Sequence, residues 1–221
     1  MNKIILVRHG ENIANITKEF SYKTVDYSLT EKGILQAEQT AEFLKTKKID
    51  FIYSSPLKRA YETAEIISNT INKTFEINEN FRELNVGILE GMKPDKNTWN
   101  IFYNVIQKWL IGISSESFPE GENLDQLTKR FKNGIIDICN GKNEKIILVV
   151  GHGGILTNEM IELSKITNKK EFYNKDNNNC SISELIVEIK KSELLIKILD
   201  WANDDHLSGE AAIFVRGLLD I

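Results

Sequence analysis

The stretch Lys3-Ile4-Ile5-Leu6-Val7-Arg8-His9-Gly10-Glu11 decides the fold. Its first part is apolar without polar alternation, which is typical of a short strand that is buried on both faces. A charged and glycine-containing segment then ends the run abruptly. Because such a strand needs cover on both sides, the stretch predicts a sheet with helices on either face.

A second apolar run, Lys145-Ile146-Ile147-Leu148-Val149-Val150, leads into Gly151-His152-Gly153-Gly154 and then into a helical pattern over 155–163. Apolar spacing predicts helices over 30–45, with a capping box of Ser28 and Glu31, and from Ser55-Pro56 onward, with Ser55 as N-cap. Further strands are predicted over 51–53, 75–77, 182–189 and 194–199, the last two as a hairpin around 190–193. This alternation predicts an α/β three-layer sandwich with a mostly parallel central sheet and helices on both faces.

Length and composition limit the possible functions. The chain has 221 residues, and we expect one domain over 1–221. A net charge of −4 argues against a nucleic-acid partner, although a local pair of arginines could still hold a small anion. Cys139 and Cys180 form no metal or disulfide motif. Neither a signal peptide nor a membrane-spanning run is apparent, so we expect a cytoplasmic protein without a membrane partner.

Two of the three histidines follow the two strongest predicted strands. Ligands of open α/β sheets bind beyond the carboxyl ends of strands, so His9 and His152 can meet at one site. Each precedes a glycine, and His152 precedes a helix whose N-terminal N–H groups favour an anion. Taken singly, each histidine also fits a structural role with satisfied hydrogen bonds.

Two arginines accompany these histidines. Arg8 precedes His9, and Arg59 lies in the first turn of the helix after Ser55-Pro56. The planar fork of arginine matches two oxygens of a phosphate. For Arg59 alone, a solvated charge on a helix surface is the simpler interpretation.

In order along the chain, these residues resemble the histidine phosphatase superfamily, which includes the cofactor-dependent phosphoglycerate mutases. The matching blocks span residues 3 to 207, and Ser28 stands where the family usually has proline. They are Arg8-His9-Gly10-Glu11 with Asn15, Asp26 to Gly33 with Gln36-Ala37, Ser54 to Ala60 with Thr63-Ala64, Arg82-Glu83-Leu84 to Gly91, Pro119-Glu120-Gly121-Glu122, Gly151 to Gly154, and Asn203 with His206-Leu207.

The resemblance implies a phosphohistidine mechanism without metal or cofactor. His9 would attack phosphorus, while Arg8, Arg59 and His152 surround the phosphate oxygens. Asn15 would add a donor, and the backbone of Gly153 would approach the substrate. Glu83 would act as the general acid, for which a surface ion pair with Arg82 is the structural alternative. A metal site of both histidines with Glu11 or Glu83 is conceivable but lacks the close histidine spacing of a zinc motif.

The resemblance also implies that a segment at about 84–121 covers the active site and helps to set specificity. Trp99, Phe102, Ile106 and Trp109 fall there at helical spacing, which suits a core-packing face or a substrate-binding wall. The segment lacks the adjacent arginine pair of the mutases. We therefore expect a phosphatase of small phosphorylated metabolites, with a phosphoglycerate mutase and a non-catalytic phosphate-binding module as alternatives. Residues 208–221 extend past the family's core and suggest a short packing helix.

Overall fold

The computed structural model describes residues 1–190 and 193–215 and places six strands in one sheet. The strand order is β3-β2-β4-β1-β5-β6. β1 pairs in parallel with β4, as β4 does with β2 and β2 with β3, whereas β5 and β6 are antiparallel additions at one edge. The strands are β1 (Asn2–Arg8), β2 (Phe51–Ser54), β3 (Glu76–Ile77), β4 (Ile146–Gly151), β5 (Ile182–Lys190) and β6 (Glu193–Asn203).

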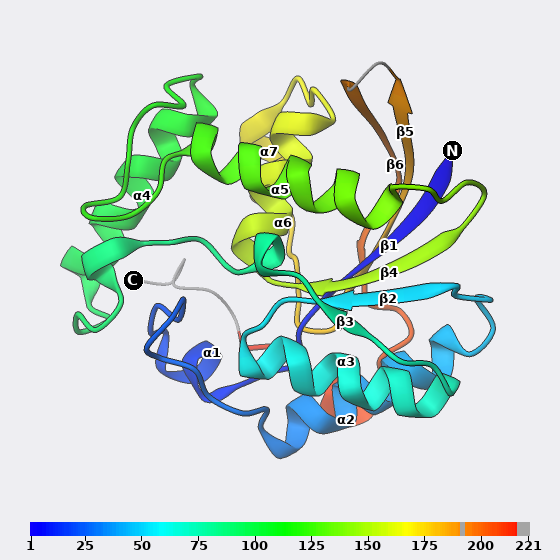
Figure 1. Cartoon of the computed structure of the whole chain (residues 1–221). Helices are drawn as coiled ribbons and strands as arrows, with labels where there is room; N and C mark the ends of the chain where they lie inside the picture. Colours follow the sequence, from blue (N-terminus) through cyan, green and yellow to red (C-terminus); the bar gives the residue numbers. More distant parts are fainter. Residues whose placement is uncertain (191–192, 216–221) are drawn as a thin grey trace.

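Helices cover both faces of this sheet, so the predicted three-layer α/β architecture is confirmed (Figure 1). In Figure 1, α2 and α3 lie below the sheet, α5 and α6 lie above it, and α1 and α4 lie toward the end at which β1 and β4 finish. The α-helices are α1 (Ile13–Thr17), α2 (Glu31–Leu44), α3 (Lys58–Ile71), α4 (Lys96–Leu110), α5 (Leu124–Cys139), α6 (Gly153–Leu163) and α7 (Lys169–Tyr173). Short 3-10 helices are η1 (Glu79–Phe81), η2 (Gly87–Leu89) and η3 (Gly209–Ala212).

The two central strands supply two separate cores. Ile4 and Leu6 of β1 pack into the core between the sheet and α4, α5 and α6. Ile5 and Val7 point to the other face and pack into the core between the sheet and α2 and α3. The side chains of β4 alternate in the same way. This division follows from the two-residue period of a strand, and it explains why both runs are continuously apolar.

Two predicted helix caps are wrong. Helix α2 takes Thr30 as its N-cap, with the hydroxyl accepting from the Gly33 N–H at 3.0 Å, so no capping box starts at Ser28. Helix α3 begins at Lys58 rather than at Pro56, and its N-cap residue, Leu57, has no capping side chain. Asp26, from a distant loop, accepts from the Lys58 N–H at 2.9 Å instead. A local pattern could not reveal a cap that comes from another part of the chain.

Helix α5, the C-terminal segment and the two cysteines complete the description of the fold. Helix α5 was not assigned from sequence, although Asn123 and Gln126 form a capping box at its start. In the C-terminal extension, η3 buries Ala211 against α2, while residues 216–221 lie outside the described residues. Cys139 and Cys180 are buried and free.

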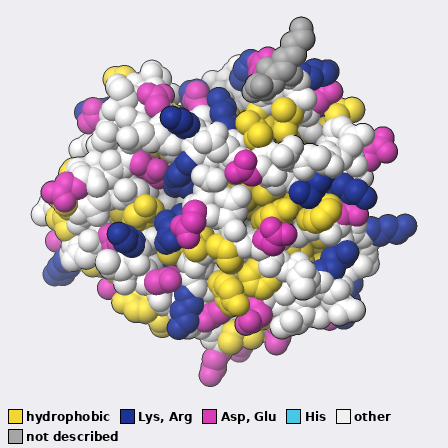
Figure 2. Space-filling view, in the orientation of Figure 1, with side chains coloured by type: hydrophobic (Ala, Val, Ile, Leu, Met, Phe, Trp, Pro, Cys, Tyr) yellow, Lys and Arg dark blue, Asp and Glu magenta, His cyan; other side chains and the backbone are white. Residues whose placement is uncertain are grey.

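The described surface carries both signs of charge. Figure 2 shows lysine and arginine side chains interspersed with acidic ones on one face. Among residues 1–190 and 193–215, no helix combines the length and apolar character that crossing a bilayer requires.

Candidate active site

His9 lies immediately beyond β1, buried, with both ring nitrogens engaged. Nδ1 lies 2.7 Å from the carbonyl oxygen of Gly10. A carbonyl only accepts, so Nδ1 carries the proton and Nε2 keeps the lone pair. Burial lowers the pKa of His9 well below 6.5, and the positive charges of Arg59 and Arg8 lower it further. The ring is therefore neutral at neutral pH, with its nucleophilic nitrogen defined.

The loop around His9 approaches the start of α2 so closely that neither Gly10 nor Gly33 has room for a side chain. A Cβ on Gly10 would lie 2.5 Å from the carbonyl oxygen of Gly33, and a Cβ on Gly33 would lie 2.0 Å from that of Glu11. The Glu11 N–H also donates to the side chain of Gln36 at 2.9 Å. The sequence block around Gly33 and Gln36 thus holds the loop that carries His9.

Arg59 contacts the nucleophilic nitrogen directly. Its Nε donates to His9 Nε2 at 3.0 Å, and its two terminal nitrogens donate to the hydroxyl and the carbonyl of Ser21 at 2.8 and 2.9 Å. Burial lowers the pKa of Arg59 to about 10, so the side chain stays charged at neutral pH. A bound phosphate oxygen would have to replace His9 as the acceptor of the Nε proton before the lone pair could attack.

The loop that holds Arg59 is itself held by Glu90. One carboxylate oxygen of Glu90 accepts from four consecutive backbone N–H groups, those of residues 22–25, at 2.6 to 3.2 Å. Burial opposes the charge of Glu90, but these backbone donors outweigh it and lower its pKa. Ser21 directly precedes residues 22–25. Glu90 therefore positions the segment whose Ser21 accepts hydrogen bonds from Arg59.

We expect Glu90→Gln to lower kcat/KM about tenfold, because a neutral amide accepts hydrogen bonds more weakly than a carboxylate does. The loss should be smaller when Ser21→Ala is already present, as coupling through Ser21 requires. Glu62→Gln is the matched control, because Glu62 accepts from the Leu29 N–H at 2.7 Å without holding residues 22–25. Steady-state kinetics of the four variants test this, and equal losses in Glu90→Gln and Glu62→Gln would contradict it.

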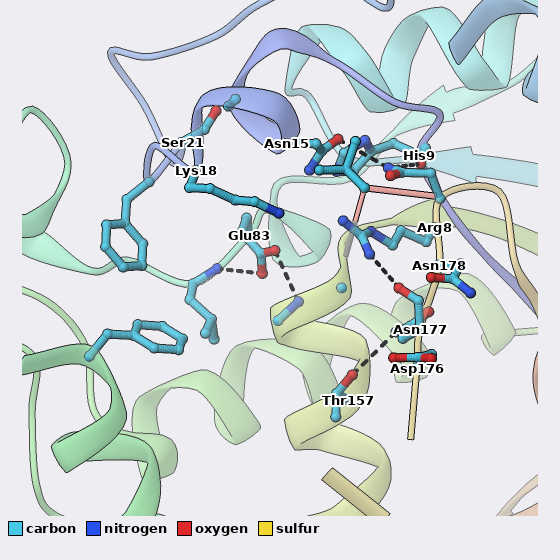
Figure 3. A pocket seen from close by; sticks show the side chains of 18 of the residues that line it. Arg8, His9, Asn15, Lys18, Ser21, Glu83, Thr157, Asp176, Asn177 and Asn178 are labelled. Atoms are coloured by element: carbon cyan, nitrogen blue, oxygen red, sulfur yellow. Dashed lines mark hydrogen bonds between the residues drawn. The ribbon is translucent and has the colours of Figure 1, made fainter. Parts of the chain in front are cut away.

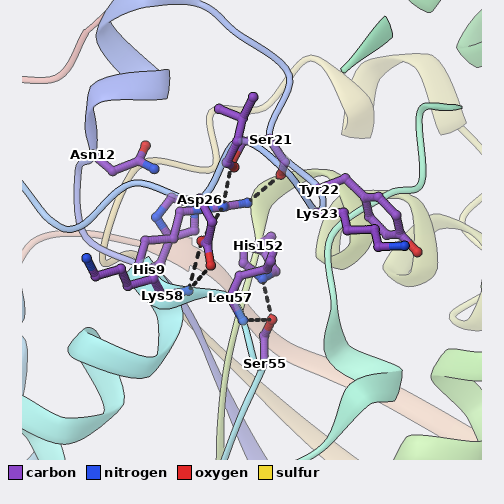
Figure 4. A network of polar contacts seen from close by, with 12 residues as sticks. His9, Asn12, Ser21, Tyr22, Lys23, Asp26, Ser55, Leu57, Lys58 and His152 are labelled. Atoms are coloured by element: carbon purple, nitrogen blue, oxygen red, sulfur yellow. Dashed lines mark hydrogen bonds and ion pairs between the residues drawn. The ribbon is translucent and has the colours of Figure 1, made fainter. Parts of the chain in front are cut away.

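His152 faces His9 from the end of β4. The two ring centroids are 5.2 Å apart. His152 Nε2 lies 2.6 Å from the hydroxyl of Ser55, and its Nδ1 has no hydrogen-bond partner among the described residues. Burial lowers the pKa of His152 well below 6.5, and the positive charge of Arg59 lowers it further. Ser55 therefore orients this ring instead of capping α3 (Figure 4).

Arg8 lies against the first residue of α6. Its Nη1 donates to the carbonyl of Asn177, and its buried Nε has no partner among the described residues. A Cβ on Gly153 would come within 3.2 Å of that Nε, so glycine here leaves room for the guanidinium. Arg8 thus keeps a donor available at the place where α6 presents its N-terminus.

Glu83 accepts hydrogen bonds from the start of α6. Its carboxylate accepts from the N–H groups of Gly154 at 3.0 Å, Ile155 at 2.8 Å and Leu84 at 2.9 Å. A Cβ on Gly154 would lie 2.7 Å from Glu83 Oε1, which explains the second glycine of this block. The structural alternative for Glu83 does not hold, since the Arg82 guanidinium pairs with Glu79 at 2.7 Å.

Arg130 braces the backbone that carries Glu83. It donates to the carbonyls of Asn80, Arg82 and Glu83 at 2.7 to 3.0 Å. Glu122 accepts from Arg130 Nε and Nη2 at 3.0 and 2.7 Å. The block Pro119-Glu120-Gly121-Glu122 therefore supports Glu83 from outside the pocket.

All predicted site residues come together around one cavity of about 610 Å³. Asn15 and Lys18 lie on its α1 side, and Figure 3 shows the Lys18 side chain directed toward Glu83 and Arg8. Asn179 donates to the His9 carbonyl at 3.0 Å and to Asn15 at 3.1 Å. The members of the predicted set are Arg8, His9, Asn15, Arg59, Glu83, His152 and Gly153; His152 lies behind the lining, against His9.

Sequence reasoning missed several supporting residues, namely Ser21, Glu90, Arg130 and Asn179. Glu90 lay in a matched block and arginine is scarce in this chain, so Glu90 and Arg130 carried a weak signal. Ser21 and Asn179 carried none. In the described part of the chain, no three His, Cys, Asp or Glu side chains cluster in a way that could hold a metal.

Known structures share this fold. Phosphoserine phosphatase from Entamoeba histolytica, solved with 3-phosphoglyceric acid, superposes with a TM-score of 0.75 at 25% identity, over 94% of this chain and 100% of that one. YhfR of Bacillus stearothermophilus superposes with a TM-score of 0.77 at 22% identity, over 93% and 99% of the two chains. The second likeness bears on the fold alone.

Three relatives are similar over most of their length. "Putative phosphoserine phosphatase 2" of Hydrogenobacter thermophilus is 33% identical over 88% of this chain and 94% of its own. "Uncharacterized phosphatase PhoE" of Bacillus subtilis is 31% identical over 95% and 98%. "Probable phosphoglycerate mutase GpmB" of Erwinia tasmaniensis is 30% identical over 84% and 85%. The sequence model of the histidine phosphatase superfamily (branch 1) matches residues 4–200, and the chain belongs to that family.

Proposed function

We propose that this protein is a metal-independent phosphatase that hydrolyses small phosphomonoesters through a phosphohistidine on His9. The observation that carries the proposal is the state of the His9 ring. Its Nδ1–H group donates to the Gly10 carbonyl, and its Nε2 accepts from Arg59. The cavity beside it is lined by Arg8 and Glu83. A neutral, oriented imidazole beside fixed positive charges is suited to attack on phosphorus.

In the first step, the His9 Nε2 lone pair forms a bond to phosphorus as the bond from phosphorus to the ester oxygen breaks. Arg8, Arg59 and His152 Nδ1, which has no hydrogen-bond partner among the described residues, stabilise the charge on the phosphoryl oxygens. Protonated Nδ1 of His152 would be the donor, with Nε2 accepting from the Ser55 hydroxyl. Asn15 and the backbone of Gly153 complete the phosphate site.

Glu83 handles the proton in both steps. The leaving oxygen takes a proton from Glu83, and the resulting carboxylate later accepts a proton from the water that breaks the bond between phosphorus and nitrogen. Three backbone donors hold this carboxylate in place at the cavity.

The phosphatase is favoured over the two alternatives. The side of the cavity formed by α4 offers Trp99, Phe102, Tyr103 and Gln107, without the arginine pair that suits a doubly anionic mutase substrate. Two of the three relatives carry phosphatase names, and one carries a mutase name. Residues 1–221 would form one domain, with the segment at about 84–121 covering the site. A binding module would not need the paired roles of His9 and Glu83.

We expect the wild-type protein to hydrolyse p-nitrophenyl phosphate equally well with and without EDTA, because two guanidinium groups supply the charge that a metal would otherwise provide. The measurement is the initial rate at several pH values after overnight dialysis against EDTA. A zinc-dependent phosphatase treated in parallel shows that the chelator works. Loss of activity in EDTA that is restored by a divalent metal would contradict the mechanism.

A further inference from the structure

Aromatic side chains form one continuous wall of the cavity. Trp99, Phe102 and Tyr103 come from α4, and Phe20 comes from the segment after α1. Ring centroids lie 4.4 Å apart for Phe20 and Trp99, and 5.6 Å apart for Trp99 and Tyr103. All four rings line the cavity, so we refer to them as the aromatic wall.

The aromatic wall is held from behind by the core. Ile106 and Trp109, on the same helix, are fully buried, and the Trp109 indole donates to the Glu116 carbonyl at 2.8 Å. Phe102 stacks on buried Phe118 with centroids 5.3 Å apart. Helix α4 therefore combines the two expected roles. Ile106 and Trp109 in its C-terminal half pack in the core, and its first two turns present rings to the cavity.

The aromatic wall and Glu83 line the same cavity. In-line attack by His9 places the departing oxygen on the far side of phosphorus, which is where Glu83 would protonate it. Tyr173, Tyr103 and Glu83 all line the cavity, so these three side chains face a common space. The alcohol part of a substrate would lie between Tyr173 and the aromatic wall.

Resting on the proposed function, we propose that the cavity selects phosphomonoesters whose alcohol carries a flat apolar ring. Stacking and burial against aromatic rings favour such a group over a hydroxylated one, which would lose hydrogen bonds to water. The cavity volume of about 610 Å³ leaves room for a ring beyond the phosphate. Lys18 lies in the segment after α1, Lys175 and Asp176 lie in the segment after α7, and Gln107 is the polar lining residue on α4.

The test compares 2-phenylethyl phosphate with glycerol 1-phosphate. Both release a primary alcohol of similar acidity, so a difference in kcat/KM reports recognition rather than leaving-group chemistry. We expect about 30-fold higher kcat/KM for the phenyl ester, and about tenfold of that preference lost in Tyr103→Ala. Tyr61→Ala, on an exposed ring of α3 outside the cavity, is the matched control.

A binding measurement separates this inference from the proposed function. 2-Phenylethylphosphonate and 3-hydroxypropylphosphonate cannot be hydrolysed, and calorimetry gives their Kd without turnover. Tighter binding of the phenyl compound that weakens in Tyr103→Ala supports the inference even if no ester is hydrolysed. Equal turnover of both esters, with equal binding of both phosphonates, would overturn the inference and leave the phosphatase intact.

Discussion

We expect His9→Ala to lower kcat at least about 10⁴-fold, because the lone pair that attacks phosphorus is removed. No other imidazole in the site is placed to substitute, since His152 directs its Nε2 to Ser55. Folding should survive, as judged by circular dichroism and the thermal midpoint. The measurement is turnover of p-nitrophenyl phosphate, with acid-labile, base-stable label trapped on the wild-type protein by rapid quenching.

His206→Gln is the matched control for this variant. His206 contacts Thr40 at 2.9 Å and does not line the cavity, so its loss should change kcat less than twofold. If His9→Ala kept more than a few per cent of the wild-type rate while folded, phosphoryl transfer to this residue would be excluded. The same conclusion would follow if label appeared on the variant as readily as on the wild type.

The environment of His9 determines the pH range in which its ring can act as a nucleophile. Burial, followed by the charges of Arg59 and Arg8, lowers the pKa of His9 well below 6.5. A group with a lowered pKa remains deprotonated as the pH falls, so His9 should stay competent between pH 7.5 and 6, where an ordinary histidine would become protonated. Titration of the His9 ring by NMR in the unliganded protein tests this, and a midpoint near 6.5 would contradict it.

We expect Glu83→Gln to lower kcat/KM about 10³-fold for an alkyl phosphate but only about tenfold for p-nitrophenyl phosphate. An alkoxide leaves poorly unless it is protonated, whereas p-nitrophenolate leaves without help. The quantity to compare is kcat/KM, because it reports transfer to His9 and is unaffected by the later attack of water. In kcat, both substrates should be slowed alike once hydrolysis of the phosphoenzyme limits turnover.

Glu79→Gln is the control for the change of charge, since Glu79 is a nearby carboxylate that pairs with Arg82 outside the cavity. It should leave the ratio of the two substrates unchanged. Equal losses of kcat/KM with good and poor leaving groups in Glu83→Gln would remove the general-acid role. Glu83 would then serve only to hold the start of α6, where it accepts from Gly154 and Ile155.

Much of the fold was predictable because burial leaves a local periodic trace. The continuously apolar runs of β1 and β4 indicated strands covered on both faces, and the structure pairs them side by side. The same runs placed His9 and His152 at equivalent strand ends, so that their meeting followed from topology. The predicted α2 was displaced by only about one residue at each end, because its apolar face faces the sheet.

The sequence by itself determined the sheet, the strand-end position of both histidines and the residue types around the phosphate site. Only the tertiary structure decided how these groups are oriented: Arg59 on the His9 lone pair, Ser55 on His152, Glu90 on residues 22–25, and Arg130 with Glu122 behind Glu83. Hydrophobic periodicity records which side of an element faces the core. A carboxylate or hydroxyl that satisfies backbone groups more than thirty residues away leaves no such record, because its partner is chosen by where the folded chain crosses itself.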